Sequence, residues 1–466
     1  MAQYRIIAPG GVNQRAFPST AGTIQARLVV NTVLQSNEVP LADPEGRLWL
    51  RLAGSTAWQW VCMRDRDGRT YIEEILESPP PARPNGTNGT SSGTIPTRPT
   101  SGNTIYPTGG RVQVVNQPYF APLIAIDNVT KQWFIVNIRE LAWFGSGYAA
   151  YNVQRTRPEH IDQHIKRARD VGARIIRFFA PLQFAPLSEA IQRVGVILDK
   201  LHQANMLGIV CLNDSIGLAN MTLAGEAPYH TAELGHLNAN YYVQQAWRTH
   251  YLPFVEQMVT AYREHPAVFS WQLINEPGIY PQPPQPGQAE AFLTFVSETS
   301  ALIARLAPKH LISVGLISSA HVGPGTDEFQ YARLFYYHLP HVHIVGTHMY
   351  QLLGNPDVNA LWDQEARSRN DYTAAQELGK AFMVDEFGAA AGDRLAATGQ
   401  FLNRWLVDRR SASVGQWGFM YPDPPTDIGI GDGVYGFDPV LNTAQGSTNA
   451  AFFPALREMF LARLGF

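Results

Sequence analysis

The sequence predicts an α/β protein with a (β/α)8 barrel and, before it, a small all-β domain. From about residue 111 onward, apolar strand-like runs alternate with amphipathic helical runs. There are eight such strand-like runs, the number that closes a (β/α)8 barrel. The runs are apolar at nearly every position, as expected of parallel strands that are covered on both faces.

The predicted barrel strands are the apolar runs at 134–143, 173–179, 207–213, 268–275, 311–317, 342–349, 381–387 and 413–421. Amphipathic stretches lie between most of them, for instance His160–Val171, Ala190–Ala204, Val243–His265 and Ala289–Leu306. An open doubly wound sheet is the main alternative, and it would usually carry a glycine-rich phosphate turn after its first strand. The turn here, Phe144-Gly-Ser-Gly-Tyr148, lacks that spacing, so the barrel is the preferred prediction.

Residues 1–78 form a separate region of short strand-like runs that glycine, proline and asparagine interrupt. The runs are Arg27–Leu34, Leu48–Leu52, Trp58–Met63 and Thr70–Ile75. Through Gly11-Val-Asn-Gln-Arg15 and Trp58-Gln-Trp60-Val61, the region resembles the bacterial SH3-like domains attached to cell-wall and polysaccharide enzymes. The resemblance implies that this domain binds polymer or cell wall, and the alternative is a purely structural appendage.

Residues 79–110 are rich in proline, glycine, serine and threonine, a composition that buries too little apolar surface to offset its ordering entropy. We expect a flexible or partly extended linker between the first domain and a barrel domain at 111–466. Such linkers suit secreted multidomain enzymes. The first ten residues lack the apolar core of a signal peptide. The expectation is therefore an extracellular protein whose signal was removed, with an intracellular location as the alternative.

The composition also excludes several classes of function. Charged residues make up 16% of the chain and the net charge is −3, so nothing indicates binding to nucleic acid or to a membrane surface. No run approaches the roughly 18 apolar residues that a membrane span needs. Cys62 and Cys211 are the only cysteines and fall in different segments, so we expect neither a disulfide framework nor a cysteine-based metal cluster. We expect no cofactor, no metal and a monomer.

Two short runs carry the strongest functional signal: Trp271-Gln-Leu-Ile-Asn-Glu-Pro277 and Val384-Asp-Glu-Phe-Gly388. Each places a glutamate, Glu276 or Glu386, at the end of an apolar strand. A charge in such a place costs several kcal/mol to desolvate unless it is paired or used. Either glutamate alone could cap a helix or pair with an arginine. Two facing carboxyl groups, however, are the minimum equipment for cleaving a glycosidic bond.

Other polar and aromatic side chains end the predicted strands, where the active sites of (β/α)8 barrels lie. The candidate substrate-binding residues are Arg177, Asn213, Asn275, His348, Tyr350, Trp417 and Tyr421. Arg177 could instead be a structural partner of a barrel carboxylate, and Trp417 could be core rather than a stacking platform. His348 alone would fit a core histidine, but Tyr350 lies two residues on and so faces the same side.

The ordered set of Asn-Glu-Pro after strand four, His-Met-Tyr after strand six and Glu-Phe-Gly after strand seven resembles glycoside hydrolase family 5, in the clan A superfamily of retaining enzymes. The resemblance covers roughly residues 130–425. It implies that Glu276 is the general acid/base and Glu386 the nucleophile.

The same resemblance implies roles for the surrounding residues. Asn275 would bind the 2-hydroxyl of the sugar, and His348 would line the −1 subsite. Arg177 and Tyr350 would hold Glu386 in its ionised form, in agreement with the stabilisation of a carboxylate by an opposite charge and a hydroxyl. Glu276 must begin the reaction protonated, and burial beside a second carboxylate would raise its pKa.

The end of strand three favours one substrate over another. Cellulase-type members often carry a histidine there, whereas this chain reads Gly208-Ile-Val-Cys-Leu-Asn-Asp214, more like the β-mannanases of the family. The sequence therefore predicts an endo-acting enzyme on β-1,4-mannan, with β-glucan or exo action as alternatives. His230 and His236 lie in a loop without an acidic cluster, which does not indicate a metal.

Two hypotheses from other classes compete with hydrolysis. A barrel that only binds carbohydrate would not need both glutamates. A metal-dependent or Schiff-base barrel enzyme would need a His/Asp cluster or a lysine at the strand ends, and the sequence places neither there.

Overall fold

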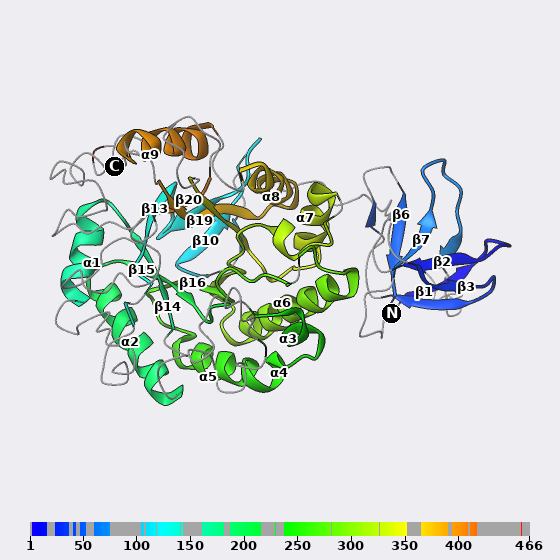
Figure 1. The fold of residues 1–466 in the computed structure, drawn as a ribbon, viewed down its shortest axis with the longest axis horizontal. Helices are drawn as coiled ribbons and strands as arrows, with labels where there is room; N and C mark the ends of the chain where they lie inside the picture. The colour runs from blue at the N-terminus through cyan, green and yellow to red at the C-terminus, as the bar shows by residue number, and fades with distance from the viewer. Residues whose placement is uncertain are drawn as a thin grey trace, which may run out of the picture. The chain divides into compact units, whose positions relative to one another are not determined.

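The computed structural model describes residues 2–15, 24–36, 41–42, 47–52, 60–74, 104–106, 109–117, 119–139, 141–142, 161–180, 187–215, 229, 237–280, 282–325, 327–351, 365–389, 394–408, 411–416 and 458. The chain divides into two compact units, one holding strands β1 to β8 and the other strands β9 to β20 (Figure 1). In the described part of the chain, no helix is long and apolar enough to cross a membrane.

The first unit is all-β, as the sequence predicts. Its strands are β1 (Ala2–Ile6), β2 (Val12–Arg15), β3 (Ile24–Leu28), β4 (Val33–Ser36), β5 (Leu41–Ala42), β6 (Leu48–Arg51), β7 (Trp60–Arg64) and β8 (Ile72–Glu74). They form an antiparallel sheet in the order β4-β1-β8 and a second in the order β3-β2-β7-β6-β5. Ile6, Leu50, Val61 and Ile72 are fully buried in the core of this unit. The likeness to SH3 domains stays a prediction.

The second unit is a closed barrel of eight parallel strands, which confirms the predicted fold class. The strands are β13 (Trp133–Asn137), β14 (Ile175–Phe179), β15 (Leu207–Cys211), β16 (Val268–Gln272), β17 (Leu311–Ser313), β18 (Ile344–Tyr350), β19 (Ala381–Gly388) and β20 (Ser413–Gln416). Each overlaps one predicted run. The barrel closes where Trp133 of β13 pairs with Ser413 of β20.

Helices surround the barrel (Figure 1). They are α1 (Ile161–Asp170), α2 (Leu187–Gln203), α3 (Ala239–Val243), α4 (Trp247–His250), α5 (Leu252–Tyr262), α6 (Pro286–Leu306), α7 (Glu328–Tyr337), α8 (Glu365–Leu378) and α9 (Arg394–Leu402), with the 3-10 helix η4 (Ser319–Val322) and the π-helix η5 (Asn403–Asp408). The amphipathic helical stretch predicted at Val243–His265 is divided between α4 and α5. Pro253 lies in the first turn of α5, the one place where a helix tolerates the missing N–H of proline.

An antiparallel sheet that the sequence did not predict covers the N-terminal end of the barrel. It consists of β9 (Thr104–Tyr106), β10 (Val112–Val115), β11 (Leu123–Ile126) and β12 (Val129–Lys131), in the order β12-β11-β10-β9. Val112, Val114, Ile124 and Ile126 join one apolar cluster with residues that begin the barrel strands. β9 lies inside the range 79–110 interpreted as a linker. Pairing with β10 orders these three residues, and no local periodicity could have indicated it.

Candidate active site

The loop after β16 holds Glu276 in an unusual backbone conformation. Its φ is 43°, a left-handed value that is rare for a residue with a side chain and that gathers at functional sites. The strands on both sides fix this turn. The Glu276 N–H donates to the Gly315 carbonyl at 2.8 Å, and the Asn275 N–H donates to the Asn213 carbonyl at 2.8 Å. The chain thus directs two consecutive polar side chains, Asn275 and Glu276, to the rim of the barrel.

A β-bulge in β19 positions the second glutamate. Thr347 pairs with Val384, but the next residue, His348, pairs with Glu386, so Asp385 is inserted into the strand. A bulge re-aims the side chains of its strand. As a result, the consecutive residues Asp385 and Glu386 are both buried, with 0% and 2% of their surface exposed.

Gly346 makes room for the bulge, because a Cβ there would lie 2.0 Å from Asp385 Oδ2. Burial raises the pKa of Asp385 to about 6, against the charges of His348 and Arg177. Asp385 was not predicted as a site residue, because the motif Val384-Asp-Glu-Phe-Gly388 indicates Glu386 alone. A bulge depends on the pairing of two strands and leaves no local signal in either.

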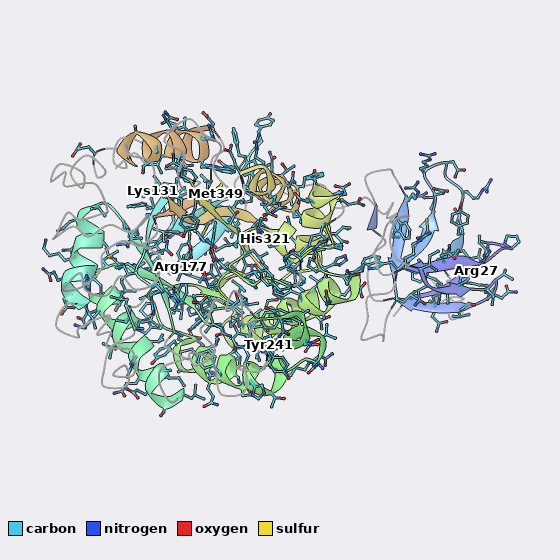
Figure 2. The ribbon with its side chains drawn as sticks, viewed as in Figure 1. Arg27, Lys131, Arg177, Tyr241, His321 and Met349 are labelled. Carbon is cyan, nitrogen blue, oxygen red and sulfur yellow. The ribbon has the colours of Figure 1, made fainter. Side chains whose placement is uncertain are left out.

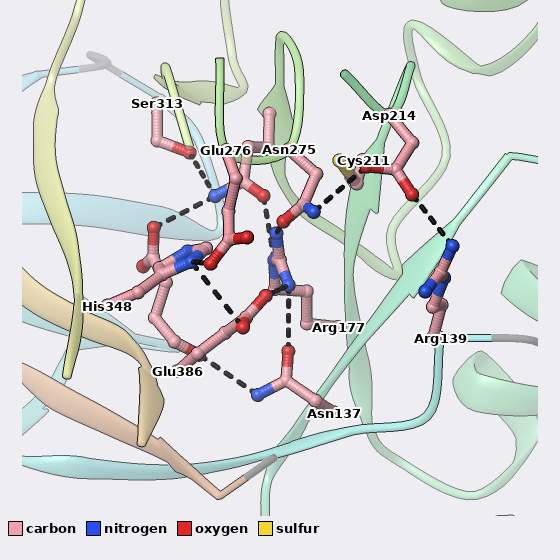
Figure 3. A network of polar contacts seen from close by, with 12 residues as sticks. Asn137, Arg139, Arg177, Cys211, Asp214, Asn275, Glu276, Ser313, His348 and Glu386 are labelled. Carbon is pink, nitrogen blue, oxygen red and sulfur yellow. Dashed lines mark hydrogen bonds and ion pairs between the residues drawn. The ribbon is translucent and has the colours of Figure 1, made fainter. Parts of the chain in front are cut away.

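Glu386 is held as a carboxylate. Arg177 Nη1 donates to its Oε1 (Figure 3). The Tyr350 hydroxyl donates to its Oε2 at 2.5 Å. His348 Nδ1 lies 3.4 Å from Oε2. Burial by itself raises the pKa of Glu386, but the charges of His348 and Arg177, with the Tyr350 hydrogen bond, outweigh it and lower the pKa below its usual value.

Glu276 has the opposite electrostatic environment. Burial raises its pKa most strongly, the hydrogen bond and charge of His348 lower it, and the charges of Glu386 and Asp214 raise it further. The net direction is upward. One carboxyl oxygen of Glu276 lies within 4.8 Å of one of Glu386. The site therefore contains a facing pair of carboxyl groups, in which the pKa of Glu386 is lowered and the pKa of Glu276 is raised.

His348 links the two glutamates. Its Nδ1 lies 2.6 Å from Glu276 Oε1. Burial lowers the pKa of the ring, but the charge of Glu386 and the hydrogen bond and charge of Glu276 raise it by more, so the net direction is upward. The ligating atoms of Glu276, His348 and Glu386 are close enough together for a metal ion. Both oxygens of Glu386 already accept hydrogen bonds, from Arg177 and Tyr350, so the arrangement favours a paired acid and base over a metal centre.

Arg177 is the centre of the polar network. It lies among the barrel strands, fully buried (Figures 2 and 3). Besides Glu386, it donates to Gln272 Oε1 at 2.7 Å, Asn137 Oδ1 at 3.0 Å and Asn275 Oδ1 at 2.7 Å. All three nitrogens of the guanidinium thus donate hydrogen bonds, which fixes its orientation. Sequence reasoning missed Asn137 and Gln272, although each is a polar side chain at the end of an apolar strand.

Six of the residues that the sequence singled out come together here: Arg177, Asn275, Glu276, His348, Tyr350 and Glu386. Asn213 lies beside the network. Its side chain accepts from the Asp214 N–H at 2.9 Å, and it is Asp214 whose carboxylate reaches Asn275. A role for Asn213 in binding substrate stays a prediction. Trp417, Tyr421, His230 and His236 lie outside the described residues.

A (β/α)8 barrel with facing carboxyl groups of opposite pKa shift at the ends of its fourth and seventh strands is the framework of a glycoside hydrolase. Comparisons with known proteins agree. Residues 229–402 match the model of the family described as GH family 5 beta-mannosidase-like. The barrel thus contains a region that matches glycoside hydrolase family 5, and the recognition made from the three motifs is confirmed.

Curated relatives match over short stretches. A probable mannan endo-1,4-beta-mannosidase C of Aspergillus terreus is 32% identical over 88 residues, 17% of this chain and 22% of that protein. A probable mannan endo-1,4-beta-mannosidase A-2 of the same organism is 25% identical over 127 residues, 27% of this chain and 30% of that protein. The chain therefore spans less than a third of the length of these relatives.

Solved structures match over most of the chain. The endo-1,4-beta-mannanase from Rhizomucor miehei has a TM-score of 0.54 at 14% identity, covering 74% of this chain and 98% of that one. The endo-beta-1,4-mannanase from Thermotoga petrophila has a TM-score of 0.52 at 16% identity, covering 72% and 77%. At these identities the likeness establishes the fold.

Proposed function

We propose that the protein is a retaining endo-β-glycosidase that hydrolyses β-1,4-mannan outside the cell by double displacement. Glu386 is the nucleophile and Glu276 the acid/base. The observation that carries this proposal is that a carboxyl oxygen of Glu276 lies within 4.8 Å of a carboxyl oxygen of Glu386. Inverting enzymes separate theirs by about 6.5–9.5 Å to admit a water molecule, and retaining enzymes by about 5–5.5 Å.

In the first step, Glu386 attacks the anomeric carbon while Glu276 protonates the oxygen of the departing sugar. The bond from the anomeric carbon to that oxygen breaks, and an ester bond to Glu386 forms. Arg177 and Tyr350 stabilise the carboxylate before attack and fix its direction. The raised pKa of Glu276 favours the protonated form, which supplies the proton.

In the second step, Glu276 takes a proton from water, and the resulting hydroxide attacks the anomeric carbon. Glu386 departs as a carboxylate. Esterification has meanwhile removed the negative charge of Glu386, one of the causes that raise the pKa of Glu276. Glu276 can therefore act as a base at this stage. Two inversions at one carbon give net retention.

The end of β15 and the sequence relatives favour mannan over glucan. The matched family is described as beta-mannosidase-like, and relatives at the sequence level are named as mannan-hydrolysing proteins. The Pro/Gly/Ser/Thr-rich composition at 79–103 supports secretion. A β-1,4-glucanase is the second candidate, because the fold and both catalytic carboxyl groups serve either polymer.

Release of reducing ends from mannan, carboxymethylcellulose and xylan tests this function. We expect mannan to be hydrolysed at least about tenfold faster than the other two, the discrimination that one hydrogen-bonding group can supply. The viscosity of the mannan should fall early, since endo action cuts within chains. The control is Glu386→Gln from the same preparation. A preference for carboxymethylcellulose would overturn the substrate, and no hydrolysis of any β-glycoside would overturn the function.

A further inference from the structure

Asp214 is a buried carboxylate that the proposed reaction does not use. It follows β15 and is 4% exposed. Its Oδ2 accepts a hydrogen bond from Arg139 Nη2 at 2.9 Å, and its Oδ1 accepts one from Asn275 Nδ2 at 3.0 Å (Figure 3). A buried charge is retained at a cost unless it is paired. Arg139 already pairs with Asp214, so the second hydrogen bond, from Asn275, needs a further explanation.

The Asn275 amide is fixed from both ends. Its Nδ2 donates to the Asp214 carboxylate, and its Oδ1 accepts from Arg177 Nη2 at 2.7 Å. Rotating this amide by half a turn would place its oxygen against a carboxylate and its NH2 group against a guanidinium. Both contacts would be repulsive, because a carboxylate only accepts and a guanidinium only donates. Asp214 and Arg177 together thus leave the amide one orientation.

That orientation decides what Asn275 can offer a sugar. The Nδ2 group has two hydrogens, and the bond to Asp214 uses one of them. The remaining N–H is the free donor of this side chain, since Oδ1 faces Arg177. A hydroxyl at the −1 subsite would therefore meet a donor. In an amide free to rotate, it would meet a donor in some molecules and an acceptor in others.

We propose that Asp214 is a positioning residue, which holds the Asn275 amide so that its N–H points to the 2-hydroxyl of the sugar at the −1 subsite. Arg139 keeps Asp214 in place. Its guanidinium lies over the Phe179 ring, 5.4 Å from the ring centroid, and its side chain is 11% exposed. This inference rests on the proposed function, in which Asn275 binds that hydroxyl.

The orientation of the Asn275 amide should affect chiefly the stability of the transition state. Hydrogen bonds to the 2-hydroxyl strengthen in the transition state of glycoside cleavage. An interaction made chiefly in the transition state lowers kcat when it is lost and leaves KM nearly unchanged. Loss of Asp214 should therefore slow substrates that carry a 2-hydroxyl and spare those that lack it. A merely structural role would slow both alike.

The test measures kcat/KM on an aryl β-glycoside of the best accepted sugar and on its 2-deoxy analogue, with the intact protein. The readout is the ratio of the two values. The inherent reactivity of the analogues cancels when this ratio is compared between variants. Asp214→Ala should lower the ratio by about 10–100-fold, because kcat/KM for the 2-hydroxy substrate falls. The kcat/KM for the 2-deoxy substrate should stay within about threefold of the wild-type value.

Three further variants complete the design. Asn275→Ala should lower the ratio at least as far, and the double variant Asp214→Ala/Asn275→Ala should lower it no further, because the two residues act as one unit. Asp371→Ala is the matched control. Asp371 is also a buried carboxyl group, and it accepts two hydrogen bonds from Ser319, but it lies outside this network. The ratio measured for Asp371→Ala should be that of the wild type.

The possible failures can be told apart. A wild-type protein inactive on both substrates would overturn the proposed function and this inference with it. An active wild type whose ratio falls in Asn275→Ala but not in Asp214→Ala would overturn this inference alone. If Asp214→Ala does not fold, the milder Asp214→Asn keeps the test. Its amide can face Asn275 with either end, so the ratio should fall in part, and an unchanged ratio would again contradict the proposal.

Discussion

Replacement of Glu386 by alanine should lower kcat by about 10,000-fold or more on every substrate, the loss typical of removing a nucleophile. In the described structure, Arg177 and Tyr350 donate hydrogen bonds to Glu386, an arrangement that supports its carboxylate as the group that forms the ester. Steady-state kinetics on an aryl β-glycoside with a good leaving group give the measurement. Such a substrate needs little proton assistance, so the loss reports the covalent step.

Azide provides the control for this variant. The space vacated by the carboxylate should admit a small anion, which would attack from the same face as Glu386. The product should be the α-glycosyl azide, with recovered turnover. Glu386→Gln, which fills the space, should be inactive and should not respond to azide. Near-wild-type hydrolysis by Glu386→Ala would show that Glu386 is not the nucleophile.

The second large effect concerns Glu276→Ala, and its size should depend on the leaving group. A sugar leaving group needs a proton from Glu276, so hydrolysis of the polymer should fall by about 100–10,000-fold, the range of general acid catalysis. A dinitrophenyl glycoside needs no such proton, and its first step should be nearly unaffected. The comparison of the two substrates in one variant measures acid catalysis directly. Equal losses on both would contradict the assignment.

The pH profile gives an independent check on the same variant. The active form of the wild type has Glu386 ionised and Glu276 protonated. Because the pKa of Glu386 is lowered and that of Glu276 is raised, the rate should fall at low pH as Glu386 gains a proton and at high pH as Glu276 loses one. Glu276→Ala should keep the acid fall and lose the alkaline one. An alkaline fall that survives would belong to another group.

The sequence was sufficient to predict the barrel and the centre of its site. Eight fully apolar strands that alternate with helices are typical of the (β/α)8 barrel, in which the C-terminal ends of the strands lie on one rim. Arg177, Glu276, His348 and Glu386 could therefore be grouped before any contact was known. Glu276 and Glu386 sit at the ends of apolar runs, and Arg177 and His348 lie within such runs, where a polar side chain is conspicuous.

The support around that centre could not be predicted in the same way. Asp385 depends on a bulge that only strand pairing creates, and Arg139 reaches Asp214 across 75 positions in sequence. The sheet over the base of the barrel shares a cluster with residues as distant as Ala412. These contacts are long-range, whereas periodicity and motifs describe only the neighbourhood of a residue along the chain.

The stereochemistry of the first product tests the central claim most directly. Proton NMR can follow the anomeric signal of the sugar released by the wild-type protein before mutarotation equilibrates it. Double displacement through Glu386 and Glu276 predicts that the β-anomer forms first and the α-anomer appears later. Early release of the α-anomer would mean a single displacement by water. That result would contradict a site in which carboxyl oxygens of Glu276 and Glu386 lie within 4.8 Å of each other.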